Sequence, residues 1–316
     1  MSPSISVVVC AYTPRRWNDL RAAVASVVRQ LRTGDECLVV IDHHEELLGR
    51  ARQEFAGAQT RVLANAAERG LSGARNTGVA ASRCDLVGFL DDDAAAGDGW
   101  VEALRAAFDD PDVAGAGSAI HPAWPGGLRP AWFPPEFDWV VGCTYLGLPT
   151  EPADVRNVIG AGMAFRRDVV DLAGGFSAEV GRIGAAPTGC EETELCIRIR
   201  QAKPQLRIRY LPQVQVAHRV GPERLTTGYF LRRCLGEGRS KARVARLVGS
   251  DAGLSSERSH VLTVLPRAVL RDLRRGLRGQ GSGFKGAALI VAGVAGAGFG
   301  YVAGRLAARR TTRSRP

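Results

Sequence analysis

The sequence predicts an α/β fold in which a mostly parallel sheet is covered by helices on both faces. Two observations predict it. Short apolar runs of strand length alternate with segments of helical periodicity, and acidic residues follow the apolar runs instead of interrupting them. The chain has 316 residues, 45% of them hydrophobic, which is enough for a sizeable buried core.

The predicted elements alternate along the first ninety residues. Ile5 to Cys10 is apolar apart from Ser6, and the apolar residues from Trp17 to Leu31 recur at helical spacing. The same alternation continues to residue 90. We therefore expect strands at 5–10, 37–41, 61–64 and 86–90, and helices at 17–31, 44–56 and 73–82. Ligands bind such sheets beyond the carboxyl ends of the strands, where Asp42 and the aspartates after residue 90 should line one crevice.

Three consecutive aspartates, Asp91, Asp92 and Asp93, follow the apolar run at 86–90. Adjacent carboxylates repel one another, and burying them is costly unless a cation compensates them. Their place at the end of a buried strand indicates a Mg²⁺ or Mn²⁺ site that holds a phosphorylated substrate. The alternative is an acidic turn before a helix that begins near Trp100.

The loop after the first strand carries no phosphate-binding glycine motif. It continues as Ala11-Tyr12-Thr13-Pro14-Arg15-Arg16, which disfavours a Rossmann dehydrogenase and a P-loop enzyme. If the site takes a nucleotide, its phosphates must be neutralised mainly by a metal ion.

A second acidic group lies at the start of a predicted helix near Glu191. On that helix Glu192 shares a stripe with the apolar residues between 195 and 199, while Glu194 and Arg198 form an i,i+4 pair elsewhere. The helix terminus favours an ionised carboxylate and burial opposes it, a balance that tunes a general base. The alternative is simple charge complementation at a helix N-terminus.

Three histidines lie close to these acidic groups or to Asp42. His218 ends the run at 214–217 and either completes the metal site or is a structural histidine at a strand end. His43 and His44 directly follow Asp42, and we expect exposed loop residues there in preference to metal ligands.

Five motifs in a fixed order carry a family resemblance. The segments VVVCAYTPRR at 7–16, RGLSGARNTGVA at 69–80, FLDDDA at 89–94, GGF at 174–176 and CEETELCIR at 190–198 resemble glycosyltransferase family 2. The resemblance covers about residues 5–220. It implies the GT-A fold, a single Rossmann-like α/β domain around a mixed, mostly parallel sheet, which transfers a sugar from a nucleotide diphosphate with inversion.

The resemblance also implies roles for particular residues. Asp93, with Asp91 and His218, would bind Mn²⁺ or Mg²⁺, and Glu192 would be the catalytic base, with Glu191 as a second candidate because the family's usual pair is Glu-Asp. Residues expected to bind the nucleotide sugar are Ala11, Tyr12, Asp42, Arg75, Asn76, Asp91, Asp92 and Arg182. A lid at 181–184 would let Arg182 pair with a phosphate or an acidic sugar.

The seven cysteines form no CxxC pair and are odd in number, which predicts reduced thiols. Residues 1–10 do not resemble a secretion signal. Both observations predict a protein that works on the cytoplasmic side.

The C-terminal quarter predicts a membrane partner. The net charge is +10, and many arginines lie beyond residue 266, which points to an anionic surface; no nucleic-acid-binding motif accompanies them. A basic helix is expected at 222–248 and can lie on a bilayer. Residues 286–304 carry no charge and can just cross or dip into a membrane, with Gly296, Gly300 and Gly304 as a close-packing face; a surface or soluble helix is the alternative.

The organisation follows from these segments. We expect a catalytic domain at 1–220, a basic helical extension at 221–283 and an apolar helix with a basic tail at 284–316. An aromatic, proline-rich insertion at 121–157 is expected to bind the acceptor, or else to be a buried flap.

The substrates are the least specific prediction. Segments 142–149 and 229–242 are similar to glucuronosyltransferases of this family that act on glucosyl-dolichyl phosphate, which implies a UDP-sugar donor, with UDP-glucuronate one candidate, and a glycan acceptor linked to a polyprenyl phosphate. A sugar-nucleotide nucleotidyltransferase and a noncatalytic sugar- or lipid-binding protein remain the alternatives.

Overall fold

The computed structural model describes residues 2–182 and 189–313. The chain divides into two compact units. Unit 1 comprises residues 1–121, 149–185 and 191–219, and unit 2 comprises residues 122–148, 186–190 and 220–316.

Unit 1 is built on a mixed sheet. Within the described residues the strand order is β3-β2-β1-β4-β8-β6-β9-β5, with β7 paired to β9. Strands β1, β2, β3 and β4 are parallel, and the pairs β4–β8, β6–β8, β5–β9 and β7–β9 are antiparallel. The bounds are β1 Ile5–Ala11, β2 Glu36–Ile41, β3 Thr60–Ala64, β4 Leu86–Asp91, β5 Ala94–Ala96, β6 Val113–Ala123, β7 Ala153–Val155, β8 Gly162–Arg166 and β9 Arg207–Arg219.

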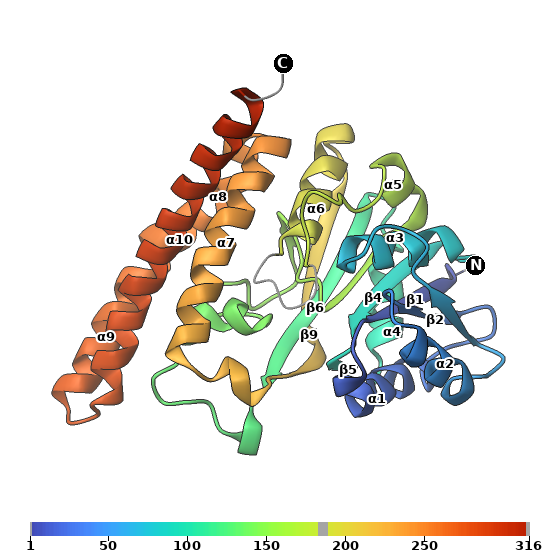
Figure 1. The fold of residues 1–316 in the computed structure, drawn as a ribbon, viewed down its shortest axis with the longest axis horizontal. Coiled ribbons are helices and arrows are strands. Elements are labelled where there is room, and N and C mark those ends of the chain that lie inside the picture. The colour runs from blue at the N-terminus through green and yellow to red at the C-terminus, as the bar shows by residue number, and fades with distance from the viewer. Residues whose placement is uncertain (1, 183–188, 314–316) are drawn as a thin grey trace. The chain divides into compact units, whose positions relative to one another are not determined.

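Helices cover both faces of this sheet, as the sequence predicts. Figure 1 shows α3, α5 and α6 on one side of the sheet and α1 and α2 on the other. The bounds are α1 Trp17–Val28, α2 Glu45–Glu54, α3 Leu71–Ala81, α4 Trp100–Ala107, α5 Arg167–Leu172 and α6 Glu191–Ala202, with a short 3₁₀ turn η1 at Pro14–Arg16. Apolar residues of α3, α5 and α6 form one buried cluster with the strands, among them Val79, Val170 and Leu195 against Val8 and Phe89. The α/β prediction is confirmed, and the predicted elements shift by a few residues at most.

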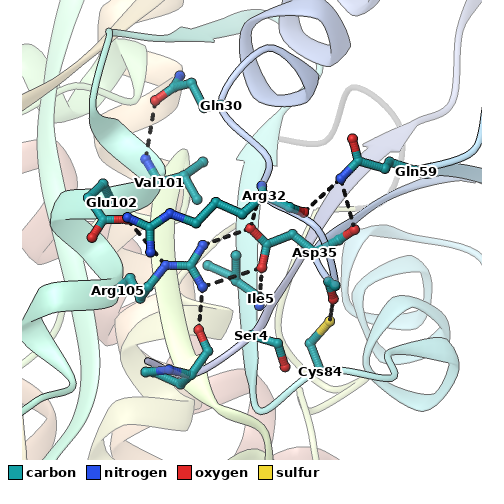
Figure 2. Close-up of polar contacts among 12 residues, drawn as sticks. Ser4, Ile5, Gln30, Arg32, Asp35, Gln59, Cys84, Val101, Glu102 and Arg105 are labelled. Carbon is teal, nitrogen blue, oxygen red and sulfur yellow. Dashed lines mark hydrogen bonds and ion pairs between the residues drawn. The ribbon is translucent and has the colours of Figure 1, made fainter. Parts of the chain in front are cut away.

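A buried ion pair ties α4 to the start of β2. Arg105 donates to both carboxylate oxygens of Asp35, at 3.3 and 2.7 Å, and both residues are buried (Figure 2). Asp35 also accepts from the backbone N–H groups of Ile5 and Arg32, and Arg105 donates to the Pro3 carbonyl. The pair therefore fixes the N-terminal edge of β1 as well as the approach to β2.

Unit 2 is helical around an aromatic core. Phe133 and Phe137 are buried against Phe230 of α7, with ring centroids 5.6 and 5.1 Å apart. These two rings of the proline-rich insertion therefore form part of the interior of unit 2, whereas Trp132 and Trp139 are half-buried. The elements are η2 Pro125–Gly127, η3 Pro135–Val141, η4 Pro222–Arg224, α7 Thr227–Val248, α8 Ser250–Ser259, the π-helix η5 His260–Val264, α9 Leu265–Leu277 and α10 Ser282–Arg313.

The basic helix predicted at 222–248 forms as α7, but its cations are not all at the surface. Arg233 and Lys241 are buried, and Lys241 lies 2.7 Å from Glu257 of α8. One described helical stretch, Ser282–Ala307, has the length and apolar composition needed to cross a membrane.

Candidate active site

The parallel strands of unit 1 bring the predicted acidic residues to one edge of the sheet. In the register of β1, β2 and β4, Cys10 is opposite Asp91, and Ala11 is opposite Ile41, directly before Asp42. The carboxyl ends of these three strands therefore meet where the sequence placed its crevice.

Asp91, Asp93 and His218 converge on one point. Each offers a ligand atom within 4.8 Å of the others, and His218 Nε2 lies 3.1 Å from Asp93 Oδ1. The antiparallel pairing of β5 with β9 sets this approach, because Ala94, next to Asp93, lies opposite His218. Asp93 and His218 are buried and Asp91 is half-buried. Two carboxylates and an imidazole form a donor set that suits Mn²⁺ or Mg²⁺ with further oxygen ligands from a diphosphate.

Arg16 is a member of the site that the sequence analysis did not assign. Its Nη1 lies 2.8 Å from Asp92 Oδ1 and 3.0 Å from Asp93 Oδ2, so one guanidinium compensates part of the aspartate charge. Burial and the charge of Asp93 nevertheless raise the pKa of Asp92 to about 7, although Arg16 lowers it. Asp92 Oδ2 is buried without a hydrogen-bond partner among the described residues, which fits a site that another cation completes.

Arg16 could have been found from the sequence, because the Arg15-Arg16 pair follows the first strand at the edge where ligands bind. The 3₁₀ turn η1 carries Arg16 from this loop toward the aspartates, with Thr13 accepting from the Arg15 N–H as its cap.

Arg75 lies between the two acidic motifs of the sequence. It is buried on α3 and donates to Glu191 at 2.9 Å, to Asp91 at 3.3 Å and to the Gly160 carbonyl at 3.0 Å. Burial lowers the pKa of this guanidinium, but the charges of Glu191 and Asp91 outweigh burial and raise it. Arg75 thus links the end of β4 to the first turn of α6.

The two candidate bases have different surroundings. Glu191 is buried, with one oxygen held by Arg75 and Oε2 without a hydrogen-bond partner among the described residues. Glu192 is half-buried, and the Thr193 hydroxyl lies 3.5 Å from its Oε1. The predicted i,i+4 pair is confirmed, because Arg198 Nε lies 2.6 Å from Glu194.

Asp42 is held in place by its neighbours. Its carboxylate accepts from Asn65 Nδ2 at 2.7 Å and from the Gly70 N–H at 3.0 Å, and His43 Nδ1 lies 2.9 Å away. His44 caps α2 by accepting from the Leu47 N–H, which gives this histidine a structural role. Neither His43 nor His44 belongs to the described group around Asp93.

The other predicted donor-site residues differ in how they are placed. The Asn76 side chain donates from Nδ2 to the Phe176 carbonyl and accepts from the Phe176 N–H on Oδ1, each at 2.8 Å. Asn76 therefore orders the GGF segment. Tyr12 is half-buried beside Arg16, whose guanidinium carbon lies 5.9 Å from the ring centroid. Ala11 is buried. The Leu71 N–H donates a hydrogen bond to the backbone carbonyl of Arg182 at 2.9 Å. Residues 183 and 184 of the predicted lid lie outside the described residues.

Comparisons with known proteins agree with this geometry. Residues 6–172 match the model of glycosyl transferase family 2. A glucosyl-dolichyl phosphate glucuronosyltransferase of Haloferax volcanii is 33% identical over 306 residues, with 96% of each chain covered. A pre-mycofactocin glycosyltransferase of Mycobacterium tuberculosis is 32% identical over 171 residues, which are 52% of this chain and 34% of that protein.

A solved structure supports the fold. A mannosyltransferase from Pyrobaculum calidifontis, in complex with GDP-Man and Mn²⁺, superposes with a TM-score of 0.59 at 15% identity, covering 93% of this chain and 87% of that one. The mixed sheet with its acidic edge is thus a GT-A fold. The chain belongs to glycosyl transferase family 2 and is a glycosyltransferase.

Proposed function

We propose that the protein transfers glucuronate from UDP-glucuronate, with inversion, to a hydroxyl of a sugar carried on a polyprenyl phosphate. The observation that carries the proposal is the grouping of Asp91, Asp93 and His218 in the same unit as the acidic turn at 191–192. The extended similarity to a glucosyl-dolichyl phosphate glucuronosyltransferase supports this choice of sugar and acceptor.

In this proposal the donor diphosphate lies at the carboxyl edge of β1 and β4. Asp91, Asp93 and His218 would hold Mn²⁺ or Mg²⁺, which would neutralise charge that develops on the leaving diphosphate. Asp42, fixed by Asn65, would accept from the uracil. Ala11, the last residue of β1, and Tyr12, directly after it, would lie against the nucleoside.

Glu192 acts as the base in this mechanism. Glu191 already accepts a hydrogen bond from the buried Arg75 at 2.9 Å, so one of its carboxylate oxygens is engaged in that contact and its side chain is fixed in position. Glu192 accepts the proton as the acceptor oxygen forms a bond to the anomeric carbon, and the bond from that carbon to the UDP oxygen breaks in the same displacement. One displacement at the anomeric carbon inverts its configuration.

The proposed place of action is the cytoplasmic face of a membrane that carries the lipid-linked acceptor. All seven cysteines are free thiols, which suits a reducing compartment. The apolar stretch Ser282–Ala307 and the arginines of unit 2 support contact with that membrane.

The test is transfer of labelled sugar to a short-chain polyprenyl-phosphate glucose, with UDP-glucuronate, UDP-glucose and UDP-N-acetylglucosamine compared. We expect product with UDP-glucuronate in the presence of Mn²⁺, and at least a 100-fold loss in Glu192→Gln, the scale of general base catalysis. Glu46→Gln, an exposed site on α2, is the matched control and should keep full activity.

Two outcomes separate the parts of the proposal. Faster transfer from another UDP-sugar would overturn glucuronate and leave the transferase intact. Normal activity of Glu192→Gln, with loss in Glu191→Gln, would move the base to Glu191.

A further inference from the structure

Exposed apolar side chains concentrate in unit 2. Among the described residues, every large exposed hydrophobic side chain except that of Leu172 belongs to this unit. Most of them lie on α9 and α10. A soluble protein seldom leaves so many apolar side chains uncovered unless a partner covers them.

The glycine face of α10 is already filled. Figure 1 shows α10 running alongside α7. A Cβ on Gly300 would collide with the Leu235 carbonyl of α7, and one on Gly238 of α7 would collide with the Ala297 carbonyl of α10. The two helix backbones contact each other at these glycines. The face of Gly296, Gly300 and Gly304, expected to be a close-packing face of a membrane helix, therefore packs against α7 within unit 2.

The opposite face of α10 is apolar and uncovered. Its exposed large side chains are separated by seven, eight, three and four residues, which places them on one side of a helix. They are Phe284, Val291, Phe299, Val302 and Leu306. The helix therefore has one packed face and one unpartnered apolar face along most of its length.

Helix α9 adds an apolar row with a cationic row beside it. Leu270, Leu273 and Leu277 are exposed, the last at 80%. The arginines of α9 divide into two groups: Arg271 and Arg275 bond the buried Asp272, at 3.0 and 3.3 Å. Three others are exposed without a carboxylate partner among the described residues: Arg267 and Arg274 on α9, and Arg278 directly after it.

The pairing of α10 with α7 argues against a membrane crossing. Helix α7 carries the exposed Arg232 and Arg239 on the stretch that packs along α10, and its buried Lys241 pairs with the half-buried Glu257 of α8. A crossing α10 would draw these charges to the depth of the hydrocarbon, where ionised side chains are strongly unfavourable. A helix in the plane of the interface avoids that cost.

We propose that unit 2 binds the surface of an anionic bilayer through α9 and α10, which lie in the membrane plane and do not cross it. The leucines of α9 and the apolar stripe of α10 enter the boundary between headgroups and acyl chains, and the free arginines of α9 bind the headgroups. The inference deepens the proposed function and rests on it only for the presence of a membrane-borne acceptor.

The test is flotation of the full-length protein with vesicles of phosphatidylcholine alone or mixed with phosphatidylglycerol. We expect binding to the anionic vesicles that weakens with salt. The triple substitution R267Q/R274Q/R278Q should weaken it about 100-fold, because each basic residue near such a surface contributes about fivefold. L270S/L273S/L277S should abolish flotation, while Leu128→Ser, an equally exposed leucine of unit 2 outside both helices, should leave it unchanged.

Binding of UDP with Mn²⁺ by each variant separates this inference from the proposed function, since the substitutions lie outside unit 1. Loss of flotation with intact UDP binding supports the docking face. Three results overturn it: no flotation of the wild type, resistance of the bound protein to alkaline carbonate extraction, or a dimer that the leucine substitutions dissociate without any effect on flotation.

Discussion

Arg75 holds together two acidic segments whose contacting residues, Asp91 and Glu191, are a hundred residues apart in the sequence. Its guanidinium is buried between Asp91 and Glu191, with the rings of Phe89 and Phe176 at 5.7 and 5.4 Å. The sequence analysis placed Arg75 beside the nucleoside. The structure gives it a further role, since removing it would leave a buried carboxylate without a counter-charge.

We expect Arg75→Met to lower the free energy of unfolding by about 3–5 kcal/mol, as for other broken buried pairs. Urea denaturation measures the loss. Arg15→Met, at an exposed neighbour of Arg16, is the control, and Arg75→Met/Glu191→Gln should recover part of the loss because the unpaired charge is gone. Equal stability of Arg75→Met and Arg15→Met would show that Arg75 does not hold the two segments.

Glu36 predicts a pH dependence of stability. Burial raises the pKa of its carboxyl, but hydrogen bonds from Arg61, Ser6 and the Arg83 N–H outweigh burial and lower it. A depressed folded-state pKa stabilises the fold above the unfolded value of about 4.3, and this contribution disappears as the pH falls through the folded value. Glu36→Gln should therefore flatten the decline of unfolding free energy with acid, and Glu46→Gln should not. Parallel curves for wild type and Glu36→Gln would refute the assignment.

At the scale of elements, the join between α4 and the loop before β2 depends on Arg105 and Asp35. Substitution Asp35→Asn removes the buried carboxylate that bonds Arg105 and leaves this guanidinium only the exposed Glu102, 3.3 Å away, as a charged partner among the described residues, so we expect a loss of about 3–5 kcal/mol in unfolding free energy. Asp98→Asn, in an exposed pair with Arg29, should cost less than about 1 kcal/mol. Thermal and urea unfolding of both variants measure the difference, and similar losses would contradict a structural role for the buried pair.

Elements with a local signal could be predicted, and their partners could not. Apolar runs correctly predicted the strands β1, β2 and β4, and helical periodicity correctly predicted α1. The length and lack of charge of residues 286–304, which lie within α10, were equally clear, and Gly296, Gly300 and Gly304 were expected to be a close-packing face for a membrane helix. That they pack on α7 depends on contacts between distant segments, which a local pattern does not contain.

At the scale of the whole molecule, the buried thiols predict resistance to oxidation and alkylation. Burial raises the pKa of Cys37, Cys196 and Cys234 to about 12, so little thiolate exists at neutral pH. Ellman's reagent at about pH 8 should therefore leave these three thiols unmodified in the native protein and titrate all seven cysteines after unfolding in guanidinium. Rapid native reaction at Cys37 or Cys196, located by mass spectrometry, would contradict the packing of the core.

The candidate site could be predicted only in part, because a sequence pattern shows which residues lie near strand ends but not which distant residues contact them. Asp91 ends β4, Asp93 directly precedes β5 and His218 lies one residue before the end of β9, so the strand pairing brings them together once the sheet forms. Arg16 compensates Asp92 and Asp93 from a turn with no recognised motif, and the bond from Arg75 to Glu191 requires α3 and α6 to meet at the sheet edge. The place of Arg16 after β1 was a usable signal, whereas the contact between Arg75 and Glu191 is set by tertiary packing, which a local pattern does not contain.

The most direct test of the account is calorimetric titration of UDP in the presence and absence of Mn²⁺, on wild type, Asp93→Asn and the exposed control Asp98→Asn. The account predicts Mn²⁺-dependent UDP binding by wild type and Asp98→Asn, and its loss in Asp93→Asn because the cation loses a charged ligand. UDP binding that is equal with and without Mn²⁺, or unchanged in Asp93→Asn, would contradict a metal-bound diphosphate at this edge of the sheet.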